Sequence, residues 1–227
     1  MRIVLASRNR KKIKELKSIL SVVSADIEIL SLDDIGYFDD TEEYGSSFEE
    51  NALIKAAVPA KAGFIGVADD SGLCVDAFGG APGIYSARYS GENATDASNN
   101  EKLLYELKKS GDTGRNAHFV CNIACAFPES FGSVCVHGSD LYNDLTGKYS
   151  DITGNLSAFS VSGRADGIIL ENARGENGFG YDPLFWVPEL SKTFAELTDE
   201  EKNRISHRGN AMKKFTAAFG EILKGIK

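Results

Sequence analysis

Apolar residues recur along this chain with two different periods, and each period predicts a different kind of element. Short continuous apolar runs, which are typical of buried strands, occur at 2–6, 26–30 and 64–68. Apolar residues spaced three or four apart predict helices over 11–22, 47–61, 95–109 and 206–222. Predicted strands and helices therefore alternate in the first part of the chain.

Three features depart from this regular alternation. Pro59 lies within the predicted helix 47–61 and should end or kink it, because proline has no N–H to donate. Further along, 117–127 and 133–137 are expected to pair as antiparallel strands. The segment 139–164 is rich in Ser, Thr, Asn, Asp and Gly, and we expect it to be an irregular or a lobe-capping insertion.

The composition limits the class of protein. With 227 residues, of which 42% are hydrophobic, the chain can bury a core of its own. It has no run of the roughly 18 to 20 apolar residues that span a membrane, and no apolar signal region follows Met1, so we expect a cytoplasmic protein. The net charge of −8 disfavours binding to nucleic acid or to an anionic membrane surface.

Cysteine and histidine give no support to a zinc site or a disulfide framework. The four cysteines show no C-x-x-C spacing and lie in apolar stretches, so buried free thiols are expected. The three histidines are far apart in the sequence, so any metal should be a hard cation with oxygen ligands. These residues are Cys74, Cys121, Cys125, Cys135, His118, His137 and His207.

The stretch 67–91 carries the residues best suited to chemistry. The strand predicted at 64–68 leads directly into Asp69 and Asp70, and active sites of open α/β sheets lie at such strand ends. Adjacent side chains on a strand point to opposite faces, so one carboxylate can face a ligand while the other shares a cation or supports it. The alternative is an ordinary strand followed by an Asp-rich turn.

Two glutamates, Glu43 and Glu50, flank the start of the helix predicted at 47–61. A carboxylate at this position could lend an oxygen ligand to a cation held by Asp69 and Asp70. The alternative is that both glutamates compensate the positive end of the helix dipole.

A second candidate site opens the first predicted helix. Serine and asparagine are preferred helix caps, and the first-turn N–H groups have no partner within the helix. With several cations in the same turn, the stretch is suited to bind phosphate, although it lacks the Walker pattern. The alternative is a capped helix with a solvated basic turn. The residues are Ser7, Arg8, Asn9, Arg10, Lys11 and Lys12.

A third group of candidate residues follows in the last third of the chain. The loop 175–185 combines glycines with aromatic residues, and an exposed aromatic there can stack on a base, the alternative being a turn packed into the core. A capping box at 198–201 opens a short helix that carries Lys202. His207 and Arg208 fall in the first turn of the last helix, where positive charge opposes the dipole, a conflict typical of functional sites.

A carboxylate cluster, cationic helix starts and an aromatic glycine loop together suit a nucleoside triphosphate with Mg²⁺. At this point the sequence resembles the inosine/xanthosine triphosphate pyrophosphatases over nearly its whole length. The matching motifs are SRNRKK at 7–12, EEYGSSFEENALIKA at 42–56, ADDSGL at 68–73, GGAPGIYSARYSG at 79–91, NGFGYDPLF at 177–185 and AELTDEEKNRISHRG at 195–209.

The resemblance implies an α/β fold in which a long, mixed, twisted β-sheet and its helices form two lobes around a central cleft. It implies a single domain over 1–227 that assembles as a homodimer. Two features depart from the family: the segment 139–164 is longer than its usual connection, and Pro59 interrupts a stretch that is usually helical.

The resemblance also implies a reaction and its catalytic groups. The substrate would be a purine nucleoside triphosphate with a deaminated base, ITP, dITP or XTP, cleaved to the monophosphate and pyrophosphate. Asp70 would be the general base and a Mg²⁺ ligand, with Glu43 and Asp69 completing the carboxylate set. Ser7, Asn9, Lys12 and the backbone N–H groups between them would hold phosphates.

The remaining roles implied by the resemblance concern the base. Phe179 would stack on it within the run Phe179, Gly180, Tyr181 and Asp182, and Ser71 would contact the substrate. The oxo edge of the purine would be recognised, and the pocket closed, by Lys202, His207 and Arg208.

Three alternatives stay open. A haloacid-dehalogenase-type phosphatase needs D-x-D, whereas here the two aspartates are adjacent. A Maf-like pyrophosphatase would differ mainly in the base that it accepts. A non-catalytic nucleotide sensor would keep the phosphate and base contacts without needing Asp70 and Glu43 together.

Overall fold

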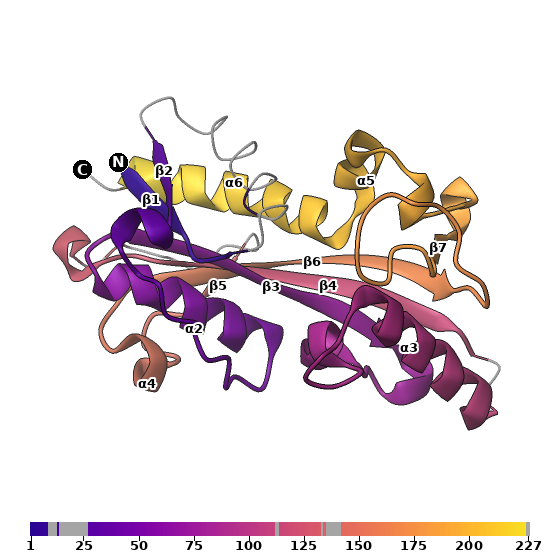
Figure 1. The fold of residues 1–227 in the computed structure, drawn as a ribbon. Coiled ribbons are helices and arrows are strands. Elements are labelled where there is room, and N and C mark those ends of the chain that lie inside the picture. Colours follow the sequence, from indigo (N-terminus) through magenta and orange to yellow (C-terminus); the bar gives the residue numbers. More distant parts are fainter. Residues whose placement is uncertain (9–12, 14–26, 112–113, 133, 135–141, 226–227) are drawn as a thin grey trace. The chain divides into compact units, whose positions relative to one another are not determined.

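The computed structural model describes residues 1–8, 13, 27–111, 114–132, 134 and 142–225. The strands are β1 Arg2–Leu5, β2 Glu28–Ser31, β3 Ile65–Val75, β4 Asn116–Ala126, β5 Asn143–Asp144, β6 Ala158–Ile169, β7 Phe185–Val187 and β8 Lys192–Thr193. The α-helices are α2 Phe48–Lys61, α3 Asp96–Ser110, α4 Ser150–Thr153, α5 Asp199–Ile205 and α6 His207–Gly225 (Figure 1). Short 3₁₀ helices cover Asp33–Ile35, Asp76–Phe78, Gly83–Arg88, Glu129–Phe131, Pro188–Leu190 and Phe194–Glu196.

The described strands form one mixed sheet in the order β2-β1-β3-β4-β6-β7-β8, with β5 paired to β6. Strand β1 runs parallel to both β2 and β3. Strands β5, β6, β7 and β8 form antiparallel pairs. The prediction of an α/β fold built on a large mixed sheet is therefore confirmed.

The contacts divide the chain into two compact units. Unit 1 comprises 1–70, 122–162 and 211–227, and unit 2 comprises 71–121 and 163–210. One domain with two lobes stays a prediction.

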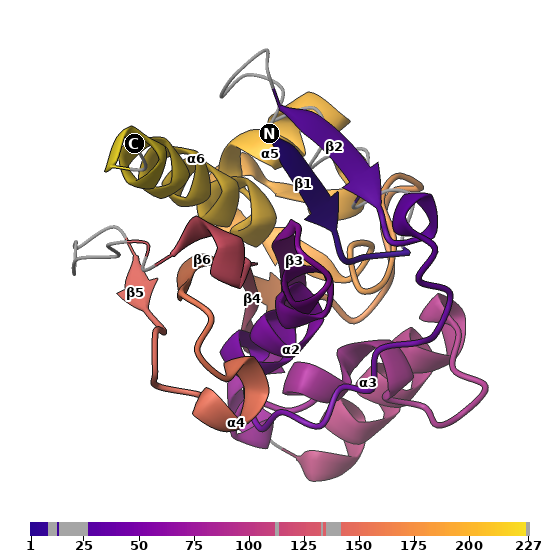
Figure 2. The same cartoon turned by 90° about the vertical axis from the view of Figure 1, so that its left-hand side faces the viewer.

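Unit 1 has its own core on both faces of its strands. Small side chains such as Ala68 and Ala158 pack against the buried face of α2, whose alanines leave room for close approach. Phe159 points the other way, and its ring stacks 5.6 Å from that of Phe215 on α6. Within unit 1, α2 and α6 accordingly cover opposite faces of the strands (Figures 1 and 2).

Unit 2 is built around aromatic side chains. Phe119 of β4 lies 4.7 Å from Phe185 of β7, and Phe185 lies at the same centroid distance from Phe194. Tyr181 and Leu103 of α3 belong to the same buried cluster. Through Tyr181, this core holds the aromatic glycine loop 175–185.

The two aspartates of the central stretch lie inside a strand and not at its end. Strand β3 continues through Asp69 and Asp70 to Val75, which corrects the boundary predicted from the sequence. Leu73 and Val75 are fully buried beyond the Asp-Ser-Gly run, so tertiary packing outweighs the turn preference of those residues. The glycine turns come later, where Gly79 has a φ of +60°, in the left-handed region that glycine tolerates.

The interpretation of 139–164 as irregular is wrong for most of its described part. Helix α4 and the first half of β6 lie within it, and Leu145 is completely buried in the core of unit 1. Glu49 on α2 connects this segment to the helix, because its carboxylate accepts hydrogen bonds from several side chains of the segment. The donors are Asn143 Nδ2 (3.1 Å), Lys148 Nζ (2.8 Å), Tyr149 Oη (2.9 Å) and Ser160 Oγ (2.6 Å).

Other boundaries follow the sequence closely. Ser47 caps α2 by accepting the Glu50 N–H, and the helix ends two residues after Pro59. The predicted capping box is present in α5, where Thr198 and Glu201 bond reciprocally. Helix 11–22, apart from residue 13, and most of strand 133–137 lie outside the described residues. No helix in the described part of the chain is long and apolar enough to cross a membrane.

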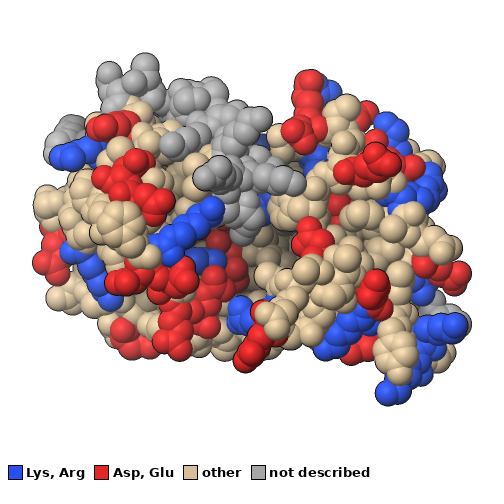
Figure 3. All heavy atoms as spheres, viewed as in Figure 1, with Lys and Arg blue, Asp and Glu red and all other residues tan. Residues whose placement is uncertain are grey.

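Acidic and basic side chains are interspersed over the face of the molecule drawn in Figure 3.

Candidate active site

The first group of candidate residues, called here the carboxylate cluster, consists of Glu43, Asn51, Lys55, Asp69 and Asp70 in unit 1. Asn51 and Lys55 are four residues apart on α2 and so share one helix face. The close approach of α2 to β3 depends on Gly66, where a Cβ atom would lie 1.9 Å from the Ala56 carbonyl oxygen.

Lys55 contacts two carboxylates of the cluster. Its Nζ lies 3.0 Å from Asp70 Oδ1 and 3.1 Å from Glu43 Oε1, and only 12% of its side chain is exposed. Asn51 Nδ2 donates to the second oxygen of Asp70 at 3.4 Å. Burial alone would lower the pKa of Lys55, but the charges of Asp70, Asp69 and Glu43 outweigh it and raise that pKa. Lys55 is therefore a firmly charged ammonium.

Sequence reasoning missed both Lys55 and Asn51. A signal was present, since these two polar residues fall on the apolar face of the predicted helix with Ala52 and Ala56. A buried lysine is rare unless it is paired, so its place on that face indicated a carboxylate partner.

The carboxylate cluster contains oxygen atoms of the kind that bind a divalent cation. Glu43 and Asp70 direct oxygens at one positive charge, and carboxylate oxygens are ligands that Mg²⁺ takes. In the described part of the chain, however, no three Asp, Glu, His or Cys side chains are already grouped as a metal site. A cation would have to join or displace the Lys55 ammonium at these oxygens.

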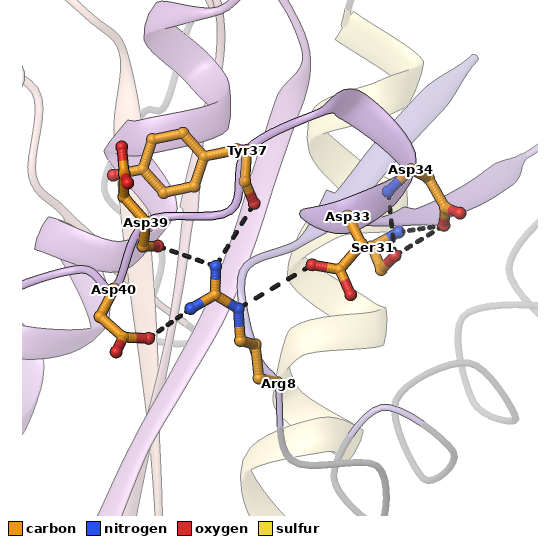
Figure 4. A network of polar contacts seen from close by, with 7 residues as sticks. All are labelled: Arg8, Ser31, Asp33, Asp34, Tyr37, Asp39 and Asp40. Atoms are coloured by element: carbon orange, nitrogen blue, oxygen red, sulfur yellow. Dashed lines mark hydrogen bonds and ion pairs between the residues drawn. The ribbon is translucent and has the colours of Figure 1, made fainter.

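Arg8, one of the predicted phosphate ligands, is bound to the acidic segment that precedes Glu43 (Figure 4). Its guanidinium forms an ion pair with Asp40, donates to the Asp39 carbonyl at 2.9 Å, and has Nε 3.9 Å from Asp33. Asp33 and Asp40 are therefore both paired with Arg8, although their side chains are largely exposed. A phosphate contact of Arg8 stays a prediction.

The other predicted phosphate ligands divide between described and undescribed residues. Ser7 is half-buried, two residues after the end of β1. Asn9, Arg10, Lys11 and Lys12 lie outside the described residues, so the proposed phosphate cradle stays a prediction.

The second group, called here the aromatic–cation cluster, consists of Phe179, Asp182, Lys202 and Arg208 in unit 2. Lys202 Nζ lies 5.1 Å from the centre of the Phe179 ring, and the Arg208 guanidinium carbon lies 5.8 Å from it. Lys202 is held by Asp182 at 2.5 Å, and Asp182 also accepts the Phe179 N–H at 2.8 Å. A half-buried aromatic ring is thus flanked by two cations, an arrangement suited to a flat, electron-rich ligand.

The neighbouring predicted residues have clear places around the aromatic–cation cluster. Arg208 donates to Ser71 Oγ at 3.2 Å, and Ser71 directly follows Asp70 along β3. The imidazole of His207 is buried and stacks 4.6 Å from the Phe119 ring. Tyr181 is a core residue whose hydroxyl donates to the Ser86 carbonyl at 2.9 Å, and burial raises its pKa.

Comparison with known proteins identifies the family of this chain. A sequence model of the Ham1 family matches residues 3–140 and 148–218. This chain belongs to the Ham1 family. The family match covers both clusters and leaves only 141–147 unmatched within the segment read as an insertion.

Relatives within the Ham1 family are similar over nearly their whole length. The chain is 44% identical over 228 residues to the dITP/XTP pyrophosphatase of Clostridium perfringens, covering 97% of this chain and 98% of that protein. It is 46% identical to the dITP/XTP pyrophosphatase of Desulfotalea psychrophila over 226 residues, covering 99% and 88%.

The fold of the Ham1 family is shared as well. The HAM1 protein of Coxiella burnetii superposes with a TM-score of 0.81 at 38% identity, covering 97% of this chain and 99% of that one. The Ham1 protein of Staphylococcus aureus gives a TM-score of 0.78 at 39% identity, with full coverage of both chains.

Proposed function

We propose that this chain is a nucleoside triphosphate pyrophosphatase that hydrolyses ITP, dITP and XTP to the monophosphate and pyrophosphate. Relatives that are 44% and 46% identical to it are named dITP/XTP pyrophosphatases. The structural observation that carries the proposal is the buried Lys55 between Glu43 and Asp70, because it gathers general-base and phosphate-binding chemistry in one place.

Asp70 is the group that would take a proton from the attacking water. Its side chain is 11% exposed, and Lys55 and Asn51 hold both of its oxygens in a fixed direction. A carboxylate fixed in this way is positioned to orient a water molecule and accept its proton.

Lys55 and a cation held by the carboxylates would each neutralise part of the negative charge of the phosphates. The Lys55 ammonium can donate to a phosphate oxygen as negative charge develops there. Mg²⁺ held by Glu43 and Asp70, with Asp69 beside them, would supply the further positive charge that the triphosphate requires. The Mg²⁺ requirement, a cytoplasmic location and a homodimeric state are parts of the same proposal.

The aromatic–cation cluster would hold the base. Phe179 offers a ring face for stacking, and Lys202 and Arg208 offer donors beside it. ITP and XTP present an oxygen acceptor at position 6 of the purine, whereas ATP presents an amino donor, so these cations favour the deaminated bases.

One assay tests the proposal. The protein is incubated with ITP, dITP, XTP, ATP and UTP in the presence and absence of Mg²⁺, and the products are separated by ion-exchange chromatography. We expect Mg²⁺-dependent formation of IMP and pyrophosphate from ITP. Orthophosphate as the first product would overturn the proposal, preference for UTP would indicate a Maf-like enzyme, and tight binding without turnover would indicate a sensor.

A further inference from the structure

Gly180, the residue after the proposed base-stacking Phe179, is held on both of its backbone polar groups by one helix. Its N–H donates to Asp96 Oδ2 at 2.8 Å, and its carbonyl accepts from Asn100 Nδ2 at 3.0 Å. Asp96 and Asn100 are four residues apart on α3, so both project from the same helix face. The two contacts therefore form a clamp between α3 and the aromatic glycine loop.

The clamp acts on a glycine. Gly180 has a φ of +62°, in the left-handed region that glycine enters at little cost, so its own backbone does not dictate this conformation. The turn has an internal bond from the Phe179 N–H to Asp182, but that bond fixes its shape and not its attachment to the rest of unit 2. Residues 171–178 before it are exposed.

Besides the buried side chain of Tyr181, polar contacts attach the turn to two different helices. On one side Lys202 of α5 holds Asp182, and on the other α3 holds Gly180. Phe179 lies between these attachments in the sequence. Loss of the α3 contacts removes the side-chain partners of the Gly180 backbone, directly after Phe179, while Lys202 keeps its partner Asp182.

We propose that Asp96 and Asn100 are positioning residues that hold Phe179 in the orientation required to stack on the base. This inference rests on the proposed function. Neither side chain needs to touch the substrate, because each acts through the backbone of Gly180. When only a fraction of molecules has the loop in its binding-competent position, the apparent affinity falls by that fraction.

The first test compares Asp96→Ala with Asp96→Asn. Alanine removes the acceptor for the Gly180 N–H, whereas asparagine keeps an oxygen acceptor and loses only the charge. We expect Asp96→Ala to raise KM for ITP about tenfold, as for a loop competent in about a tenth of molecules, with kcat changed much less. Asp96→Asn should restore most of the affinity. The control is Glu101→Gln, which removes an exposed carboxylate from the same helix.

Asp96 also lies in the first turn of α3, where a carboxylate stabilises the helix dipole. A role limited to the helix predicts that Asp96→Asn behaves like Asp96→Ala, since both remove the charge. That result would overturn the proposal. Asn100→Ala, which leaves the charge of Asp96 in place, should raise KM in the same direction.

A double-mutant cycle with Phe179→Ala gives the sharpest test. If Asp96 acts through Phe179, then Asp96→Ala should have little effect on KM once the ring is absent. Amide hydrogen exchange of the 175–184 segment should also rise in Asp96→Ala while that of the second half of α3 is unchanged. Additive effects on KM, or unchanged exchange, would refute the inference.

The two proposals fail in distinguishable ways. A wild-type protein that does not hydrolyse ITP refutes the proposed function. A wild-type enzyme whose KM depends on Phe179 but not on Asp96 or Asn100 refutes only the positioning role.

Discussion

The ammonium of Lys55 lies 3.0 Å from Asp70 Oδ1, and both side chains are close to nine-tenths buried. The two residues come from α2 and β3, which face each other within unit 1. Because Lys55 also lies 3.1 Å from Glu43, its single positive charge offsets two carboxylates. Removing either partner of such a pair leaves an uncompensated charge, which is costly in a buried place.

Lys55→Met is expected to lower both stability and activity. Loss of the cation leaves Glu43 and Asp70 facing each other, so the free energy of unfolding should fall by about 3 kcal/mol. The kcat for ITP should fall roughly 10²-fold, because a donor to developing phosphate charge is lost. Added Mg²⁺ should raise the melting temperature more in this variant than in wild type, while Lys55→Arg should keep most of the stability. Wild-type kcat in Lys55→Met would contradict the role given to Lys55.

Asp70→Asn is expected to abolish most turnover. Loss of a general base typically costs 10²- to 10⁴-fold, and loss of a cation ligand adds to it. Because the positive charge of Lys55 loses one of its two carboxylate partners, the free energy of unfolding should also fall modestly, as measured by urea unfolding. Asp76→Asn, which alters a more exposed carboxylate immediately after β3, is the control and should leave kcat unchanged. More than about a tenth of wild-type activity would show that Asp70 is not the base.

Local patterns in the sequence predicted most of the regular elements, because these depend on periodicity and caps. The capping residues Ser47 and Thr198 and the helix α3 all lie where the sequence indicates. The end of β3 was misjudged because Asp, Ser and Gly favour turns locally, whereas Leu73 and Val75 extend the strand through burial in unit 2.

Contacts between distant residues could not be read from the sequence in the same way. The pairing of Lys55 with Glu43 and Asp70 depends on how α2 packs against β3, and the bonds of Glu49 reach about a hundred residues along the chain. The prediction of Phe179 and Lys202 as neighbours came from family motifs, and the structure brings them together. The anchoring of Gly180 by α3 had no signal in the local pattern.

Replacement of 140–163 by a short Gly/Ser linker is expected to unfold unit 1. The replacement removes Leu145 and Phe159, both fully buried, and half of the central strand β6. The milder change Leu145→Ala should cost about 2 to 5 kcal/mol, measured by urea unfolding. Asp144→Ala, at an exposed neighbouring position, serves as control. A folded, active linker variant would show that this segment adds little to the core.

The hydrogen bonds to Glu49 should make stability depend on acid pH. Burial alone would raise the pKa of Glu49, but bonds from Lys148, Ser160, Tyr149 and Asn143 outweigh it and lower that pKa below 4.5. The unfolded chain therefore binds a proton more readily, so the stabilisation is present above pH 4.5 and is lost as pH falls below it. In urea unfolding, Glu49→Gln should lose more stability at pH 7 than at pH 3.5. Asp151→Asn, an exposed carboxylate of the same segment, should show no such difference.

The choice of base should depend on Lys202. Its ammonium has three donors, and Asp182 accepts from it at 2.5 Å, so the group is held beside Phe179 with capacity for a ligand acceptor. An inosine or xanthine base offers the 6-oxygen to such donors, whereas adenine opposes them with an amino group. Each unpaired buried polar group costs about 1 to 3 kcal/mol, so two mismatches correspond to roughly 10²- to 10⁴-fold discrimination in kcat/KM.

We expect kcat/KM for ITP to be well above that for ATP, and Lys202→Ala to narrow this gap more than it slows ATP hydrolysis. GTP also carries the 6-oxygen, so the argument does not predict its rejection. Lys192→Ala is the matched control, because Lys192 is a partly exposed lysine paired with Glu201 and should leave the ratio unchanged. Lys202→Ala also leaves Asp182 without its ammonium partner. The melting temperature of each variant is therefore measured alongside the kinetics. If Lys202→Ala slows both nucleotides by the same factor, these cations serve the phosphates and the base is read by other groups.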